Sequence, residues 1–418
     1  MTRAMKDSGI EWIGEIPQDW SISKVKHCFT RKNSKAKQDD PVVLSLARSG
    51  VKIRDISTNE GQLAESYYDY NPVQVGDLLL NPMDLYSGAN CSYSDVEGVI
   101  SPAYINLKNK EGVSNSKFYD YYFKVQYWMM VLFSFGKGVS FDNRWTLGQE
   151  TLMNFPIVYP LLPEQQKIAD FLDEKCSHID SVLEKVRASI DEYKQLKQSI
   201  ITQAVTKGVR PNCPMKDSGI EWIGEIPQDW SIIAHKYVMY KDKKICEHYN
   251  GEDIISLTMS GVIKRDLDAG GKMPTTFDGY QYVEPEDLLL CLFDIDVTPR
   301  CVGVVKDYGI TSPAYSRFKV NKGYFNKYYD YLLRMIDNDK VFVHLAKNLR
   351  SSLKEDDFGA IKTIVPPMLE QKQISDYLDD KCSEIDKLIT KKEQLIVELE
   401  TYKKSLIYEY VTGKKEVK

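Results

Sequence analysis

The stretch MKDSGIEWIGEIPQDWSI occurs twice in this 418-residue chain, at positions 5–22 and again at positions 215–232. Identity over the whole stretch at an offset of 210 cannot arise by chance, so the chain is a tandem duplication of one unit. Shorter matches follow in the same order, and near the end of each copy the offset falls to 206. They include DLLL (77–80 and 287–290), SPAY (101–104 and 312–315), Glu164-Gln165 with Glu370-Gln371, and Asp173 with Asp379. The sequence therefore predicts a pseudo-two-fold internal repeat.

Each copy ends in a stretch whose apolar residues recur every three or four positions, which is the period of an α-helix. This stripe runs from Ile168 to Ala204 and stops before Gly208, and the second copy repeats it from Ile374 to Leu406. A helix of about 43 residues would be roughly 64 Å long, which exceeds a domain of this size. We therefore expect the two helices to pair antiparallel as a coiled coil. The alternative is that each helix packs on its own domain.

The segments between the matching ends are divergent and show mixed α/β patterns. Strands are predicted at 41–46, 77–80, 155–158, 253–257 and 360–365, and aromatic-rich helices at 117–132 and 326–336. We interpret those aromatic residues as core rather than as a base-stacking surface. The expected fold class is α+β, with two mixed α/β domains and two long antiparallel helices. The predicted domains are 1–160, a central helix at 161–210, 211–365, and a C-terminal helix at 366–418.

Composition excludes several classes of protein. The mean hydropathy is −0.39, and no apolar run approaches the roughly 18 residues that span a bilayer. With no secretion signal at the start, we expect a cytoplasmic protein without a membrane partner. The 8 cysteines form no CxxC pair, which argues against a zinc module or a disulfide framework. The net charge of −5 excludes a globally cationic nucleic-acid binder but leaves room for local basic patches.

Enzyme motifs are absent from the sequence, which contains no phosphate-binding GxxxxGK[ST] loop, no GxGxxG after a strand and no HExxH. Asn81-Pro82-Met83-Asp84 superficially resembles the Asn-Pro-Pro-aromatic element of amino-methyltransferases, but it lacks the second proline and the aromatic residue. No glycine-rich cofactor loop precedes it. We therefore predict no catalytic residues and no metal site in this chain.

Basic residues recur at comparable places in the two divergent segments. Arg144 aligns at offset 206 with Arg350, and each precedes a leucine and then a predicted strand. Arginine can grip phosphate, or read guanine through two hydrogen bonds in the major groove. The alternative for any one of them is a solvated charge or a structural ion pair. The other candidate DNA-binding residues are Arg48, Lys52, Arg54, Lys137 and Asn143 in the first copy, and Lys264, Arg265 and Lys347 in the second.

Two variable domains, each preceded by a near-identical segment and followed by a long helix, resemble the specificity subunit of type I restriction-modification systems. The resemblance covers essentially the whole chain. It rests on GIEWIGEIP (9–17 and 219–227), both SPAY motifs, Arg144 and Arg350 with their downstream leucines, and the openings of the helices, PLLPEQQKI (160–168) and PPMLEQKQI (366–374).

The resemblance implies that each domain is a target recognition domain reading one half of a split, asymmetric double-stranded DNA site. The helices would set the spacing between the half-sites and dock two methyltransferase subunits, which restriction-translocase subunits would join. S-adenosylmethionine, ATP and magnesium would belong to those partners, and this chain would carry no cofactor. Two readers on one strut favour half-sites about one helical turn apart, roughly 34–36 Å.

Three alternatives remain open from the sequence. The chain could be the recognition subunit of a type II-like fused enzyme, which would share the fold and differ in its partner. It could be a coiled-coil scaffold that binds proteins only, although divergent domains on a retained frame argue against this. It could be an active methyltransferase, which the missing cofactor loop argues against.

Overall fold

The computed structural model describes residues 3–47, 50–57, 64–83, 85, 90–138, 145–259, 261–267, 274–298, 301–346 and 352–417. The chain divides into two compact units. Unit 1 consists of Met1–Val186 and Gln394–Lys418, and unit 2 consists of Arg187–Glu393. Each unit therefore combines one α/β domain with part of each long helix.

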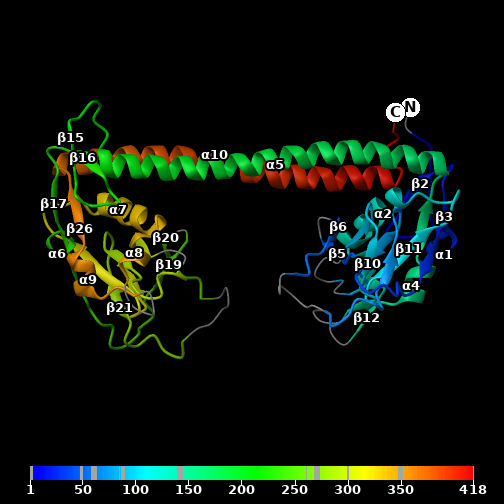
Figure 1. Cartoon of the computed structure of the whole chain (residues 1–418), viewed down its shortest axis with the longest axis horizontal. Coiled ribbons are helices and arrows are strands. Elements are labelled where there is room, and N and C mark those ends of the chain that lie inside the picture. The colour runs from blue at the N-terminus through cyan, green and yellow to red at the C-terminus, as the bar shows by residue number, and fades with distance from the viewer. Residues whose placement is uncertain are drawn as a thin grey trace. The chain divides into compact units, whose positions relative to one another are not determined.

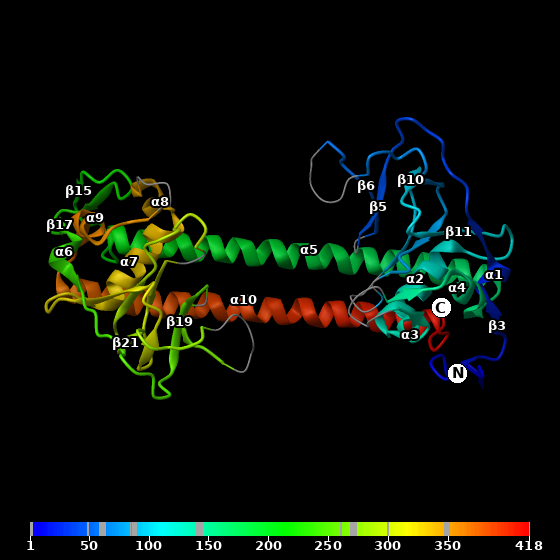
Figure 2. The same ribbon diagram turned by 90° about the horizontal axis from the view of Figure 1, so that it is seen from below.

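The two long helices are α5 (Leu162–Lys207) and α10 (Met368–Val411), of 46 and 44 residues. Within unit 1, Phe171 packs on Tyr410 and Asp180 pairs with Lys403. From the first contact to the second, the residue numbers rise in α5 and fall in α10, so the two helices are antiparallel. Figures 1 and 2 show α5 and α10 side by side.

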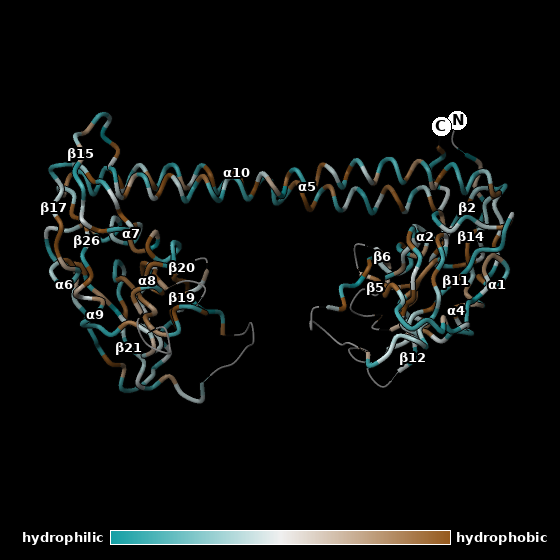
Figure 3. Tube along the Cα trace, in the orientation of Figure 1, coloured by the Kyte–Doolittle hydropathy of each residue, from teal (hydrophilic) through white to brown (hydrophobic). Residues whose placement is uncertain are grey.

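Unit 2 contains the same antiparallel pairing of the two helices. Lys392 lies over the ring of Tyr193, and Lys197 forms an ion pair with Asp386 at 2.7 Å. Along α5 and α10, apolar and polar residues alternate, as Figure 3 shows, because one stripe faces the neighbouring helix. The predicted antiparallel pairing is confirmed.

The domain of unit 1 is built around a four-stranded antiparallel sheet in the order β4-β11-β8-β9. The helix α2 (Ser116–Trp128) contacts β9 on this sheet. The other elements of unit 1 are β1 (Met5–Asp7), β2 (Glu15–Pro17), β3 (Ser21–Lys24), α1 (Val25–Cys28), β4 (Phe29–Lys32), β5 (Leu44–Ala47), β6 (Gly50–Ile53), β7 (Asn71–Val73), β8 (Leu78–Leu80), β9 (Cys91–Tyr93), β10 (Gly98–Ile100), β11 (Ile105–Asn109), α3 (Val131–Ser134), β12 (Gly136–Lys137), β13 (Thr146–Leu147), α4 (Gln149–Asn154) and β14 (Pro156–Tyr159).

The domain of unit 2 repeats this plan with the sheet β18-β25-β22-β23. Its helix α7 (Asn326–Asn338) contacts β23 as α2 contacts β9. The remaining elements are β15 (Met215–Asp217), β16 (Glu225–Pro227), β17 (Ser231–Ala234), α6 (His235–Val238), β18 (Met239–Lys241), β19 (Ile254–Thr258), β20 (Gly261–Lys264), β21 (Gln281–Val283), β22 (Leu288–Leu290), β23 (Val302–Val304), β24 (Gly309–Thr311), β25 (Ser316–Val320), α8 (Val341–Leu345), α9 (Glu355–Ala360) and β26 (Lys362–Val365).

The core of each unit lies between the sheet, the domain helix and the long helices. All three residues of the central strand β8 are buried, and so are those of β22, because the repeated DLLL segment supplies the middle of each sheet. Phe118, Tyr119 and Phe123 of α2 are fully buried, so these rings form core, as predicted. The α+β fold class and the pseudo-two-fold repeat are confirmed. Among the described residues, no helix has the length and apolar character needed to cross a membrane.

Candidate nucleic-acid interface

The described residues that flank three turns of unit 1 are linked at one edge of its domain. The turns are the hairpin β5–β6, the segment between β8 and β9, and the hairpin β12–β13. The side-chain amide of Asn90 donates to the carbonyl of Ala47, beside the tip of the first hairpin. The N–H of Leu147 donates to the carbonyl of Pro82 over 2.8 Å. These bonds join turns that lie far apart in the sequence into one edge, which we call the loop edge.

Unit 2 has a corresponding loop edge. The N–H of Leu353 donates to the carbonyl of Leu292 over 2.8 Å, as Leu147 does to Pro82 in unit 1. The hairpin β19–β20 approaches β23 closely, since a Cβ added to Gly303 would lie 2.7 Å from Cγ2 of Val262. Residues that flank the equivalent turns are therefore linked in both units.

The two residues that close the turn between β8 and β9, or between β22 and β23, differ between the loop edges, and we call this pair the neck of the turn. In unit 1 the N–H of Asn81 donates to the carbonyl of Asn90 over 2.9 Å. In unit 2 the N–H of Cys291 donates to the carbonyl of Cys301 over 2.8 Å. Two amide side chains in one unit thus correspond to two buried thiols in the other.

The cysteine neck is buried, and the N–H of Cys301 donates to the carboxylate of Asp337 over 2.9 Å. Burial raises the pKa of the Cys301 thiol, and the nearby carboxylate of Asp337 raises it further, so the thiol stays neutral. Phe293 and Val297, in the turn that follows, are exposed. The loop edge of unit 2 therefore presents two exposed apolar side chains at this turn.

The predicted DNA-binding residues fall into two groups. Arg48, Asn143, Arg144, Lys347 and Arg350 lie outside the described residues. Lys52, Arg54, Lys137, Lys264 and Arg265 are described.

The described candidates are spread over two kinds of hairpin. Lys137 lies on β12, exposed at the loop edge of unit 1. Lys52 is exposed on β6, and Arg54 is half-buried just beyond that strand. Lys264 is exposed on β20 and pairs with Asp253 at 2.7 Å, and Arg265 follows it. Lys52, Arg54 and the Lys264–Arg265 pair lie toward the bases of their hairpins, away from the tips, so the structure does not join them to Lys137.

Each loop edge is carried by a domain that is clamped to a long helix. In unit 1, the indole N–H of Trp20 donates to Glu164 over 2.8 Å, and Arg3 pairs with the same carboxylate at 2.6 Å. In unit 2, Trp230 donates to Glu370 over 2.9 Å, and Arg210 pairs with it at 2.9 Å. The repeated segment thus fixes the first turn of α5 and the first turn of α10 in the same way.

The arginines of these clamps bind a second carboxylate. Arg3 hydrogen-bonds Asp19 over 3.0 Å, and Arg210 hydrogen-bonds Asp229 over 2.8 Å. The hydrogen bonds to Asp229 and Glu370 raise the pKa of Arg210, and Arg210 lowers the pKa of Asp229. Both groups remain charged around neutral pH, so the clamp is an ion-pair network there.

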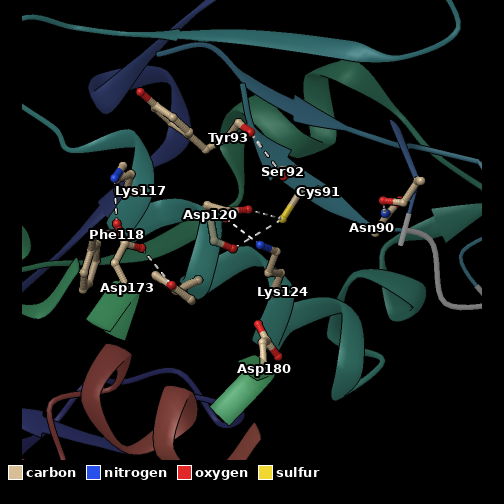
Figure 4. Close-up of polar contacts among 12 residues, drawn as sticks. Asn90, Cys91, Ser92, Tyr93, Lys117, Phe118, Asp120, Lys124, Asp173 and Asp180 are labelled. Carbon is tan, nitrogen blue, oxygen red and sulfur yellow. Dashed lines mark hydrogen bonds and ion pairs between the residues drawn. The ribbon is translucent and has the colours of Figure 1, made fainter. Parts of the chain in front are cut away.

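A second contact holds each domain helix on its long helix. Asp173 of α5 accepts hydrogen bonds from Lys117 at 2.6 Å and from Tyr121 at 2.8 Å, both on α2. Figure 4 shows Asp173 facing Lys117. In unit 2, Asp379 accepts from Lys327 and, over 2.9 Å, from Tyr331 of α7.

Behind this contact in unit 1 lies a buried polar cluster. Asp120 accepts a hydrogen bond from Lys124 at 2.6 Å, and its backbone carbonyl accepts one from the thiol of Cys91. Figure 4 shows these three side chains together. Burial raises the pKa of Asp120, and Lys124 offsets this effect. Asp330 and Arg334 form the corresponding pair in unit 2, at 2.6 Å.

The clamp carboxylates were not identified as functional from the sequence, although a signal was present. Glu164, Glu370, Asp173 and Asp379 all stand in the short matches between the two copies. The neck residues Asn81 and Asn90 were also missed, because Asn81 was weighed only as part of a methyltransferase motif. Its place directly after the repeated DLLL segment marks it as the start of an equivalent turn. Among the described residues, no three His, Cys, Asp or Glu side chains gather as a metal site.

Known proteins share this architecture. No family model matches the chain. The putative type I restriction enzyme MjaX specificity subunit of Methanocaldococcus jannaschii is 24% identical over 438 residues, covering 97% of this chain and 96% of that protein. The MjaVIII specificity subunit of the same organism is 24% identical over 372 residues, covering 83% of this chain and 80% of that protein.

Two solved structures share the fold. A chain from a study of complex assembly and conformational transition of the type I restriction-modification system aligns with a TM-score of 0.69 at 12% identity, covering 96% of this chain and 99% of that chain. The HsdS subunit of Thermoanaerobacter tengcongensis aligns with a TM-score of 0.51 at 13% identity, over 96% of this chain and 98% of that chain.

The duplicated α/β domain with shared antiparallel helices is the fold that this chain has in common with those two solved structures. Over most of its length the chain is similar to type I restriction enzyme specificity subunits. The resemblance predicted from the sequence is confirmed. The fused type II-like enzyme and the protein-only scaffold are not favoured.

Proposed function

We propose that this chain is the DNA sequence-recognition subunit of a type I restriction-modification complex. The domain of each unit reads one half of a bipartite, asymmetric site, and α5 and α10 set the number of unread base pairs between the halves. The observation that carries this proposal is a contrast within the repeat. The clamps at Glu164 and Glu370 are the same, whereas the loop edges differ in residues and chemistry.

The DNA-contacting residues are proposed from the basic and polar residues that the sequence places in the two divergent domains. We assign direct contacts to Arg144 and Arg350 first. Supporting contacts are assigned to Arg48, Lys52, Arg54, Lys137, Asn143, Lys264, Arg265 and Lys347. The domains are assigned to 1–160 and 211–365, and the spacer helices to 161–210 and 366–418.

The partners follow from the family and from the absence of enzyme motifs in the sequence. Two methyltransferase subunits dock on the helices and restriction-translocase subunits complete the cytoplasmic complex. S-adenosylmethionine, ATP and magnesium are bound by those subunits, and this chain carries no cofactor.

Lengthening both helices tests the role of the spacer. Four residues inserted after Val186 in α5 and four after Glu393 in α10 add about one turn, or roughly 6 Å. That is about two base pairs at roughly 3.4 Å each. Sequencing of methylated sites should then show both half-sites unchanged and the gap longer by about two base pairs. The same insertion after Asn212, outside the helices, is the control and should leave the gap unchanged. A changed half-site would contradict the spacer mechanism.

Alanine at Arg144 tests the assigned contact. If this arginine reads a base, discrimination at one position should fall by about 1–3 kcal/mol. If it holds phosphate, affinity should fall uniformly and the salt dependence should weaken. Binding of the assembled complex to a panel of single-base variants separates these outcomes, and no change in either quantity would overturn the assignment.

A further inference from the structure

Each domain is attached to its long helix at two separate points. The first is the tryptophan–glutamate clamp in the first turn of the helix. The second is a carboxylate nine residues further along the same helix, Asp173 in α5 or Asp379 in α10. Nine residues of α-helix span roughly 13 Å. Because the two points lie this far apart, a domain held at both resists turning about either one alone.

The second attachment in unit 1 uses both oxygens of one carboxylate. Lys117 donates to Oδ2 of Asp173 over 2.6 Å, and Tyr121 donates to Oδ1 over 2.8 Å. The two donors are four positions apart on α2, so they lie on the same face of that helix. One hydrogen bond fixes a distance between two helices, whereas two bonds to one carboxylate also fix the angle between them.

Unit 2 repeats this contact atom for atom. Lys327 donates to Oδ2 of Asp379, and Tyr331 donates to Oδ1 over 2.9 Å. The helices α2 and α7 are identical at only four of their thirteen positions. Two of the four are these donors, and the other two are the core residues Tyr329 and Asp330. The contact is therefore shared by two domain helices that otherwise differ.

The stability that this contact adds does not explain why both units have it. The side chains of the two ion pairs are between 37% and 47% exposed, and ion pairs at such positions contribute little to the free energy of unfolding. Packing does not require the lysines either, since neither is buried. Burial raises the pKa of Tyr331, so its hydroxyl stays protonated and remains a donor. What the contact provides is a defined angle.

This angle matters because the loop edge lies far from the long helix. Figure 1 shows β12, at the loop edge of unit 1, on the side of the domain away from α5. A domain of about 150 residues has a radius of gyration of about 15 Å, so its far edge lies roughly 30 Å from its attachment. A turn of about 6–7° then moves that edge by about 3.4 Å, which is one base-pair step.

We propose that Asp173 and Asp379 are positioning residues, which fix the angle of each domain on its long helix and so restrict the complex to one gap length between the half-sites. The inference rests on the proposed function and adds to it. The length of the helices sets the mean gap, and these two carboxylates set how narrowly that gap is accepted. Neither carboxylate selects the bases that are read.

Three variants of unit 2 test the proposal in the full-length chain, assembled with its methyltransferase subunits. Asp379→Ala removes both acceptors. Tyr331→Phe removes one hydrogen bond and keeps the ion pair with Lys327. Glu384→Gln is the matched control, because it removes an ion pair with Lys381 that lies within α10 and does not involve the domain.

Two measurements are made on each assembled complex, with S-adenosylmethionine supplied. The first is the rate of methylation of duplexes that carry both half-sites, with the wild-type gap and with gaps one base pair shorter and longer. The second is the sequence of both half-sites, read from the methylated sites of genomic DNA. Together they separate the angle of the domain from its choice of bases.

Wild type and Glu384→Gln should strongly prefer one gap length, because a misplacement of about 1 Å can cost roughly a hundredfold in rate. In Asp379→Ala the preference over the two neighbouring gaps should fall by roughly tenfold, and in Tyr331→Phe by about threefold, with both half-sites unchanged. Melting temperatures should differ by no more than about 2–4 °C, since the ion pairs are exposed. If Asp379→Ala melts much lower, Tyr331→Phe decides the matter, because it keeps the ion pair.

Two results would overturn the positioning role and leave the proposed function intact. One is a gap preference that stays as narrow as in the wild type, whether or not the rate falls equally at every gap length. The other is a changed half-site. A wild-type complex that methylates no split site with a fixed gap would instead refute the proposed function itself.

Discussion

In unit 1 the buried carboxylate of Asp77 is neutralised from strand β4, whereas in unit 2 its counterpart Asp287 is neutralised from strand β25. Lys32 of β4 pairs with Asp77 at 2.5 Å, and Asn106 of β11 donates to the same carboxylate over 3.2 Å. In unit 2 the strand that matches β11 supplies Arg317, whose guanidinium bonds the carboxylate of Asp287.

The exchange involves one cross-strand pair. Lys32 and Asn106 lie opposite each other in the sheet. Asp242 and Arg317 occupy the same two places in unit 2, where the N–H of Asp242 donates to the carbonyl of Arg317. The cation has moved to the neighbouring strand while the carboxylate of the repeated segment has stayed. Changing one partner alone would leave a buried carboxylate without a cation, so these positions differ as a set.

The largest expected effect comes from removing the cation in unit 2. Arg317→Ala leaves Asp287, 4% exposed, without its buried partner. The free energy of unfolding of unit 2 should fall by about 3–5 kcal/mol. The matching change in unit 1, Asn106→Ala, retains Lys32 and should cost only about 1–2 kcal/mol. Hydrogen exchange followed by mass spectrometry assigns each loss to its unit, and equal losses would contradict the comparison.

The next effect depends on pH and on a position where the units differ. His235 is fully buried, stacks on Phe358, and corresponds to Val25 of unit 1. Burial lowers the pKa of His235 to about 4, from 6.5 when exposed. Above pH 6.5 the imidazole is neutral in both the folded and the unfolded chain, so the full free energy of unfolding is retained. As the pH falls from 6.5 to 4, the unfolded chain binds a proton that the folded chain does not, and the free energy of unfolding falls. This amounts to about 3 kcal/mol, at roughly 1.4 kcal/mol per pH unit.

The substitution His235→Val provides the control, since unit 1 carries valine there. Denaturation at several values of pH between 4 and 7 should show a steep loss of unit 2 stability in the wild type and a shallower one in the variant. Parallel curves would mean that His235 does not cause the acid sensitivity.

A smaller loss of stability is expected from changes to the clamp between a tryptophan and a glutamate, which both units contain. Trp20→Phe and Trp230→Phe each remove the indole hydrogen bond to a clamp carboxylate, at a cost of about 2 kcal/mol. The loss at Trp230 should be the larger one, because the side chain of Glu370 is 5% exposed and that of Glu164 is 22% exposed. Thermal melts of both variants measure this. A loss confined to one of the two positions would show that the clamps are not equivalent.

The smallest effect concerns the ion pairs between the long helices. Asp180→Asn removes the pair with Lys403 in unit 1, and Asp386→Asn removes the pair with Lys197 in unit 2. Both carboxylates are exposed, so each change should cost less than about 1 kcal/mol and should vanish at high salt. Melting temperatures at low and high ionic strength check this, and a large loss at high salt would be inconsistent with a surface pair.

Sequence patterns predicted the parts of the fold that repeat or alternate regularly. The stripe from Ile168 to Ala204 predicted α5, and the DLLL segments predicted the central strands β8 and β22. The sequence showed only that Glu164 is repeated as Glu370. It did not predict the clamp, because the clamp depends on a hydrogen bond from Trp20, which is far away in the sequence.

Other features had no local signal in the sequence. The cation that neutralises Asp77 or Asp287 comes from different strands, so matching the copies letter by letter does not find it. The loop edges form through bonds such as Leu147 to Pro82 and Leu353 to Leu292, which depend on the tertiary fold. The predicted contacts at Arg144 and Arg350 lie outside the described residues and stay predictions.

Unit 1 is built from two separate segments of the chain, and this has a consequence for its folding during synthesis on the ribosome. Unit 2 is one continuous stretch, Arg187–Glu393, whereas unit 1 needs Gln394–Lys418 to complete it. Gly413 packs against Pro17 and Trp20, and Val417 is buried in the same core. The domain that is translated first therefore waits for residues 394–418 to leave the exit tunnel. A stop codon just after position 393 would leave the later-made unit 2 intact and the earlier-made unit 1 unfinished.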